Sequence, residues 1–123
     1  MILLDPEDPS GYAHRSDALL DLGRLDEAMA DIEAALALDS GESDNYVRRG
    51  ILRVEQRRFD EAEADFAEAL RLDAENAWAH NNLGNSFFQQ ARYGEAAAAF
   101  AEALDIDPEY GIARYNRGLA RFR

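Results

Sequence analysis

The fold is decided by the stretch from Ala77 to Tyr110, AWAHNNLGNSFFQQARYGEAAAAFAEALDIDPEY, because its pattern recurs along the chain. A shift of 34 residues places Gly50, Gly84 and Gly118 in one column. The same shift aligns three further columns of small and apolar residues: Ala28, Ala62 and Ala96; Ala35, Ala69 and Ala103; and Leu36, Leu70 and Leu104. Within each copy, apolar residues return at spacings of three, four and seven, as in two amphipathic helices. A fixed period of this length predicts a repeat architecture.

The period divides the chain into successive units. We expect residues 9–42, 43–76 and 77–110 to form three full repeats, each a pair of antiparallel helices. Residues 1–8 match the end of a preceding repeat, and residues 111–123 match the first helix of a fourth. The prediction is therefore an all-α array of about seven helices that forms part of a longer series of repeats.

Two sequence features are expected to shape each helix pair. Pro108 follows the last predicted second helix, whereas Ser40 and Ala74 take its place in the earlier copies, so those helix ends should be less sharp. Gly50 and Gly84 should face the alanine column of the second helix. A larger side chain there would push the two helices apart at a cost of about 1–3 kcal/mol.

Together, these columns resemble those of the tetratricopeptide repeat family. Tyr115-Asn116-Arg117-Gly118 is similar to the variant with Asn-Arg-Gly on its first helix, and Arg48-Arg49-Gly50 matches this variant in part. The resemblance implies an α-solenoid, in which antiparallel helix pairs stack into a right-handed superhelix and the first helices line a concave groove. It also implies a protein-interaction scaffold that is not an enzyme.

A comparison of the copies predicts a salt bridge inside the first two. Arg15 and Arg49 occupy one column, and the same two copies carry Asp31 and Asp65 on the second helix. The third copy has Leu83 and Ala99 at these positions. Because the arginine and the aspartate are present together or absent together, we expect each pair to join the two helices of its repeat.

Composition narrows the classes of function. The 25 acidic and 13 basic residues give a formal net charge of −12, which argues against binding to nucleic acid or to an anionic membrane. The absence of cysteine excludes disulfides, thiolate zinc sites and a cysteine nucleophile. His14 and His80 stand at different phases of the repeat, so we expect no metal site, no cofactor and no catalysis. No apolar run approaches the ~20 residues of a membrane helix, and the cytoplasm is the default expectation for location.

The groove implied by the resemblance changes character along the chain. Its first half is mostly acidic, and its second half is rich in amide and aromatic side chains. The residues predicted to bind a peptide are Arg48, Trp78, Asn81, Asn82, Asn85, Tyr115 and Asn116. An amide both donates and accepts hydrogen bonds, so a row of asparagines suits the backbone of an extended peptide. The alternatives are that the asparagines are ordinary surface residues and that Trp78 only packs on a neighbouring helix.

Asn82 and Asn116 share a column and resemble the asparagine ladder of O-linked N-acetylglucosamine transferases, which His14 and Arg48 interrupt in the earlier copies. A second known groove is the clamp that holds the C-terminal carboxylate of chaperones. Asn85 and Asn116 match its two asparagines, but Asn81 takes the place of its first lysine. In the register that fits inside the chain, Asp17 and Trp78 stand where the clamp requires asparagine and lysine, which argues against it.

Two other functions remain open at this stage. The first is a substrate-recruiting segment of a larger enzyme such as a glycosyltransferase. The second is self-association as a homo-oligomer, through the apolar residues of the incomplete units at 2–4 and at Leu119 and Phe122.

Overall fold

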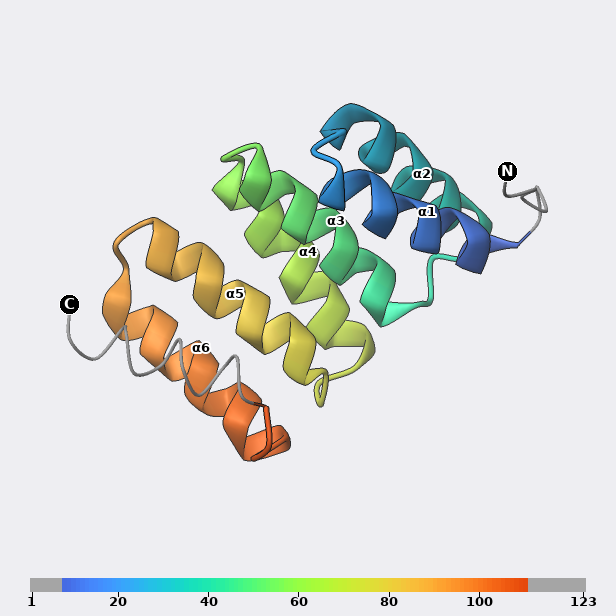
Figure 1. Ribbon diagram of the computed structural model, residues 1–123. Helices are drawn as coiled ribbons and strands as arrows, with labels where there is room; N and C mark the ends of the chain where they lie inside the picture. Colours follow the sequence, from blue (N-terminus) through green and yellow to red (C-terminus); the bar gives the residue numbers. More distant parts are fainter. Residues whose placement is uncertain (1–7, 111–123) are drawn as a thin grey trace.

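The computed structural model describes residues 8–110, which form six α-helices and no β-strand within that range. The helices are α1 (Pro9–Asp21), α2 (Leu25–Leu38), α3 (Ser43–Glu55), α4 (Phe59–Leu72), α5 (Ala77–Gln89) and α6 (Tyr93–Ile106) (Figure 1). The count is six where about seven were expected, since the predicted seventh helix, at 111–123, lies outside the described residues. None of the six is long and apolar enough to cross a membrane.

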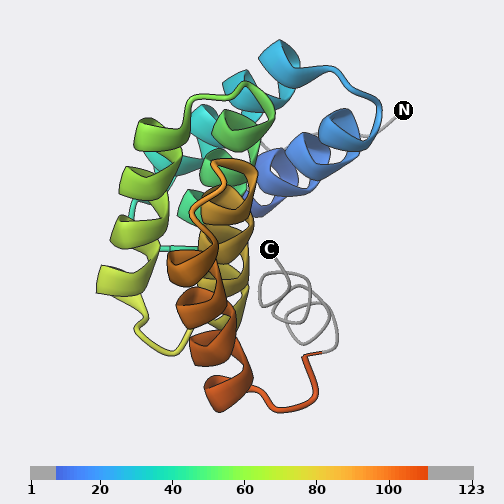
Figure 2. The same ribbon diagram turned by 90° about the vertical axis from the view of Figure 1, so that its left-hand side faces the viewer.

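The helices form three hairpins that stack side by side (Figures 1 and 2). The first helices α3 and α5 also pack on the second helix of the preceding hairpin, α2 and α4 respectively. Among the described residues, α1 contacts α3 and α3 contacts α5, whereas α2, α4 and α6 do not contact one another. An array whose helices approach more closely on one side curves toward that side, so α1, α3 and α5 form the concave face. The predicted all-α solenoid is confirmed at this level.

Each hairpin closes where a very small residue meets a large one. A Cβ atom at Gly50 would lie 2.5 Å from the ring of Phe66, so the nearest side chain to this glycine is an aromatic ring that the prediction did not place there. Gly84 has the same relation to Phe100, also at 2.5 Å. The glycine therefore makes room for a buried aromatic ring, which occupies the centre of the hairpin.

The first hairpin fills the equivalent space between its helices with different residues. Ser16 replaces the glycine, and its hydroxyl donates a hydrogen bond of 2.9 Å to the carbonyl of Ala28. Ile32, which is fully buried, replaces the aromatic ring. A larger residue on the first helix is thus matched by a smaller one on the second.

The second helices end at equivalent residues with or without proline, so the predicted difference in their ends is wrong. The residues that follow them, Asp39, Asp73 and Asp107, leave the helical conformation. Each accepts a hydrogen bond through its carboxylate from the backbone N–H two residues on, at 2.9, 3.0 and 3.1 Å respectively. This local turn ends the helix, because the aspartate side chain offers the backbone a partner that a helix would not.

The first helices end in a shared tight turn. Its central residue has a positive φ in all three hairpins: Gly23 at 74°, Arg57 at 60° and Ala91 at 61°. The N–H of the next residue bonds back to the carbonyl five residues earlier, which satisfies the end of the helix. Glycine adopts this conformation at no steric cost, whereas Arg57 and Ala91 do so under some strain.

Candidate functional site

The concave face is organised around Arg48, which joins three helices. Its Nε lies 3.1 Å from both carboxylate oxygens of Asp17 on α1, and its Nη1 donates to Oδ1 of Asn45 at 3.2 Å. Its guanidinium lies 5.3 Å from the ring centroid of Trp78 on α5. The charge of Arg48 is therefore already matched by Asp17, and its side chain is held in place from both neighbouring hairpins.

Trp78 is half-buried and packs against the apolar core of the second hairpin. Trp78 therefore packs on a neighbouring hairpin, which was one of the two interpretations of this residue, and it also lies against Arg48. These contacts hold the ring in place.

The amides of α5 differ in how much of their hydrogen-bonding capacity is used. Nδ2 of Asn82 donates to the carbonyl of Trp78 at 2.9 Å, while its Oδ1 has no partner among the described residues. Asn85 is half-buried and makes no hydrogen bond within that part of the chain. Asn81 is only 6% exposed, and its Oδ1 has no partner among residues 8–110. Asn82 and Asn85 thus offer accessible groups to a ligand, whereas Asn81 lies beneath the surface.

The remaining predicted site residues, Tyr115 and Asn116, lie outside the described residues. The structure therefore brings together Arg48, Trp78 and Asn82 and places Asn85 one turn further along α5.

A depression of about 150 Å³ marks the other half of this face. It lies between the start of α1 and the start of α3, and the residues that line it include His14, Asp39, Glu42 and Asp44. The acidic character expected for the first half of the groove is present here. Within residues 8–110, no group of histidine and acidic residues is arranged to hold a metal ion.

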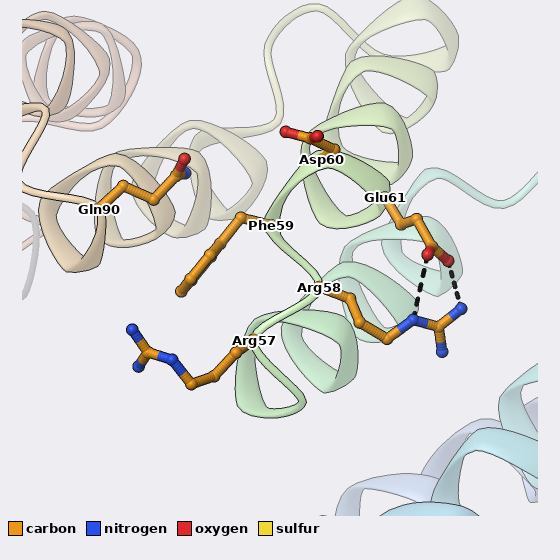
Figure 3. A pocket seen from close by; sticks show the side chains of 6 residues that line it. All are labelled: Arg57, Arg58, Phe59, Asp60, Glu61 and Gln90. Atoms are coloured by element: carbon orange, nitrogen blue, oxygen red, sulfur yellow. Dashed lines mark hydrogen bonds and ion pairs between the residues drawn. The ribbon is translucent and has the colours of Figure 1, made fainter.

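A second hollow, of about 320 Å³, lies at the turn between α3 and α4 and not on the concave face (Figure 3). Its lining residues are Arg57, Arg58, Phe59, Asp60, Glu61 and Gln90. The reasoning from sequence did not single out this hollow, because it forms only where the end of α5 approaches the preceding hairpin.

The predicted salt bridges inside the first two hairpins are confirmed. Arg15 donates from Nε and Nη2 to the two carboxylate oxygens of Asp31, both at 2.6 Å. Arg49 donates to Oδ1 of Asp65 at 3.0 and 2.8 Å. Asp31 and Asp65 are buried, at 5% and 3% exposure. The hydrogen bond to Asp31 raises the pKa of the Arg15 guanidinium above its ordinary value.

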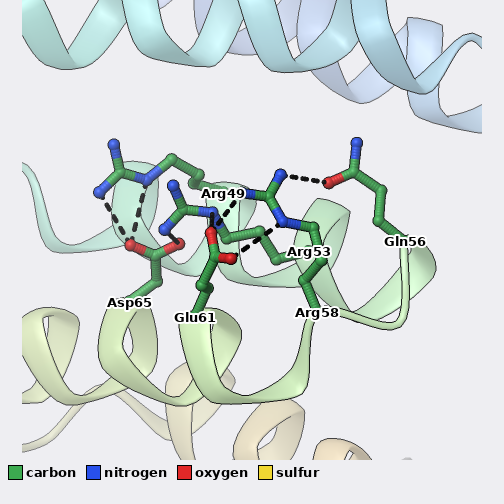
Figure 4. A network of polar contacts seen from close by, with 6 residues as sticks. All are labelled: Arg49, Arg53, Gln56, Arg58, Glu61 and Asp65. Carbon is green, nitrogen blue, oxygen red and sulfur yellow. Dashed lines mark hydrogen bonds and ion pairs between the residues drawn. The ribbon is translucent and has the colours of Figure 1, made fainter.

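The prediction missed one member of the second bridge. Nη1 of Arg53 donates to the other oxygen of Asp65 at 2.9 Å, so two arginines share one buried carboxylate (Figure 4). Arg53 follows Arg49 by four residues and so lies on the same helical face, which was a signal available in the sequence. In the first hairpin the equivalent residue is the apolar Leu19.

Comparison with known protein families identifies one kind of repeat along the chain. A sequence model described as Tetratricopeptide repeat matches residues 47–111 and 83–123, and another with the same description matches residues 9–42. A comparison with curated proteins returned no match.

Several solved structures are similar to this chain. The TPR domain of Arabidopsis OM64 is 25% identical, with a TM-score of 0.87 over 95% of this chain and 97% of that one. The first TPR domain of human RPAP3 is 18% identical, with a TM-score of 0.89 over 96% and 93%. The first TPR of Spaghetti (RPAP3), bound to the HSP90 peptide SRMEEVD, is 18% identical, with a TM-score of 0.85 over 99% and 97%.

Proposed function

Because the chain belongs to the tetratricopeptide repeat family, we propose that it is a non-catalytic scaffold that binds an extended peptide or protein segment on the concave face of α1, α3 and α5. The main observation behind the proposal is that two amide side chains of α5 have hydrogen-bonding groups that are not used within the described residues. Asn82 keeps a free Oδ1, and the amide of Asn85 is unused within the described residues. Asn82 stands beside the Arg48 and Trp78 pair, and Asn85 lies one turn further along α5.

The spacing of the two amides suits a peptide backbone. Side chains three residues apart on a helix are neighbours, with Cβ atoms about 5–6 Å apart. An extended chain rises about 3.3 Å per residue, so backbone groups two residues apart on a ligand recur at a similar distance. Asn82 and Asn85 can therefore each pair with the ligand's main chain without selecting its side chains.

The ligand proposed here differs from a chaperone tail. A similar structure holds an HSP90 peptide that ends in an acidic sequence. In this chain, Asp17 and Trp78 occupy positions where the carboxylate clamp requires asparagine and lysine, and Asp17 already engages Arg48. The concave face between α1 and α5 offers a carboxylate tail no uncommitted cation among its described residues.

The proposal is tested by selecting displayed 12-residue peptides on the full chain and measuring their affinities by calorimetry. We expect Asn82→Ala and Asn85→Ala each to weaken binding by about three- to tenfold, since a net hydrogen bond contributes about 0.5–1.5 kcal/mol. Gln56→Ala removes an amide at the end of α3 and serves as the matched control.

The melting temperatures of the three variants should stay close to that of the wild type, since neither α5 amide anchors the core. Binding that survives the double Asn82→Ala, Asn85→Ala variant unchanged would place the peptide site elsewhere.

A further inference from the structure

One arginine of the described residues differs from all the others. Eight of the nine have a carboxylate within ion-pair distance, namely Arg15, Arg24, Arg48, Arg49, Arg53, Arg58, Arg71 and Arg92. Arg57 is the ninth and has no such partner in residues 8–110. In a chain with a net charge of −12, a cation that no acidic side chain engages stands out.

Arg57 borders the hollow at the α3–α4 turn. Its guanidinium lies 5.1 Å from the ring centroid of Phe59, which is half-buried. In Figure 3, the side chains of Arg57 and Gln90 lie on either side of Phe59, whereas Arg58 turns away to pair with Glu61. The hollow thus combines a free guanidinium with an aromatic surface.

The equivalent turns of the other hairpins show that the fold does not require this arginine. The position holds Gly23 in the first hairpin and Ala91 in the third. With φ at 60°, Arg57 adopts a conformation that glycine takes without strain. Ala91 adopts the same conformation, so the strain by itself does not indicate a function. What distinguishes Arg57 is its long, charged side chain, which forms no ion pair within the described chain.

We propose that Arg57 and Phe59 form a second interaction surface, which binds an acidic side chain of a protein partner at the turn edge of the array. The planar guanidinium donates paired hydrogen bonds that match a carboxylate. Phe59 holds the guanidinium plane from one side and offers apolar contact to the partner residue beside the acid.

The surrounding charges restrict the partner further. Arg58 is paired with Glu61, and Arg92 with Glu63, so these groups compensate one another. Asp60 is exposed, lines the same hollow and has no partner in the described residues. A run of several acidic residues would be repelled by Asp60. The surface therefore fits a single aspartate or glutamate flanked by neutral or basic residues.

The test again uses displayed peptides selected on the full chain, each resynthesised with its acidic residue changed to the corresponding amide. We expect a class of selected peptides whose affinity falls about tenfold or more on Arg57→Gln, and equally on the change from acid to amide. Combining the two changes should produce no further loss, because both remove the same contact. Asn82→Ala should leave this class unaffected, which separates it from ligands of the concave face.

Two further variants test whether Arg57 has only a structural role. Arg57→Gly should abolish binding of this class without lowering the melting temperature, since glycine relieves the positive φ. Ala91→Gly relieves the same strain in the third hairpin and should leave binding unchanged. The proposal is overturned if selection yields no peptide that depends on both its acid and Arg57, or if Arg57→Gly lowers the melting temperature.

Discussion

The first two hairpins and the third have the same helices, but the space between those helices is filled differently. In the first two, a buried aspartate on the second helix pairs with an arginine on the first. In the third, Leu83 and Ala99 take these places. A depression lies beside this position in both the first hairpin, where it measures about 460 Å³ and is lined by Arg15 and Asp31, and the third, where it measures about 340 Å³ and is lined mainly by apolar residues. Because the helix bounds are equivalent in all three, the bridge does not determine the hairpin.

The feature common to all three hairpins is the match between a small residue on the first helix and a large one on the second. Gly50 with Phe66 and Gly84 with Phe100 follow the same geometry, although only the former pair is accompanied by a bridge. Steric fit therefore sets the distance between the helices, and the polar or apolar contact beside it is interchangeable. The following variants test this view, beginning with the largest expected effect.

Removing Asp65 should destabilise the protein most. Asp65→Ala leaves the cations of Arg49 and Arg53 without their buried partner, and we expect a loss of about 2–4 kcal/mol in the free energy of unfolding. Urea unfolding followed by circular dichroism measures this loss. Glu68→Ala, which removes an ion pair with Arg71 on the same helix and outside this network, is the control and should cost less than about 1 kcal/mol. A similar cost for the two variants would contradict the account.

Filling the space at Gly84 should have the next largest effect. A methyl group there would meet the ring of Phe100, and overpacking of this kind costs about 1–3 kcal/mol. Gly84→Ala should therefore lower the melting temperature. Gly94→Ala, on the second helix of the same hairpin, has nothing within 4 Å of its new Cβ and should be neutral or stabilising. If both variants were neutral, steric fit would not be the common determinant.

Converting the first hairpin to the residues of the third should have a small effect. Asp31→Ala alone leaves Arg15 unpaired and should cost about 1–3 kcal/mol. Adding Arg15→Leu removes both partners, and the double variant should return to within about 1 kcal/mol of the wild type. The cycle of single and double variants, measured by urea unfolding, yields the coupling. Strictly additive costs would show that the pair contributes nothing as a pair.

The smallest effect concerns an ion pair that recurs in all three hairpins, between Arg24 and Glu27, Arg58 and Glu61, and Arg92 and Glu95. Hydrogen bonds from Arg58 and Arg92 lower the pKa of Glu61 and Glu95, respectively, below the ordinary value of 4.5. A lowered pKa in the folded state means that the stabilisation is present above pH 4.5 and is lost as the pH falls through the folded pKa. Carbon-detected NMR titration should place both midpoints below 4.5, and Arg92→Gln should raise only that of Glu95. If the pKa of one of these glutamates were lowered and that of the other were not, the two ion pairs would not share the same geometry.

The sequence was sufficient to predict the salt bridges between the two helices of one repeat. The copies align in a fixed register, so Arg15 with Asp31 and Arg49 with Asp65 could be inferred from their joint presence in the first two copies. The close approach of the Phe66 ring to Gly50 could not be inferred in this way, because Ala62 and Phe66 are both buried on α4 and the alignment of the copies does not say which of them lies nearer to the glycine.

Contacts between side chains of neighbouring repeats could not be predicted from the sequence. Arg48 lies 31 residues from Asp17 and 30 from Trp78, and the contact among them depends on how far each hairpin is rotated relative to the next. The same rotation buries Asn81 while Asn82 and Asn85 remain accessible. The residue types of the candidate site could be predicted, but the accessible atoms could not.

The central claim is that the third hairpin's first helix carries the peptide site. It is tested most directly by NMR of the ¹⁵N-labelled chain titrated with a selected peptide, observing the side-chain amide signals. We predict that the signals of Asn82 and Asn85 shift together and saturate at the same peptide concentration, while that of Gln56 stays in place. Shifts confined to the backbone of α2, α4 and α6, with both asparagine signals unmoved, would contradict the claim.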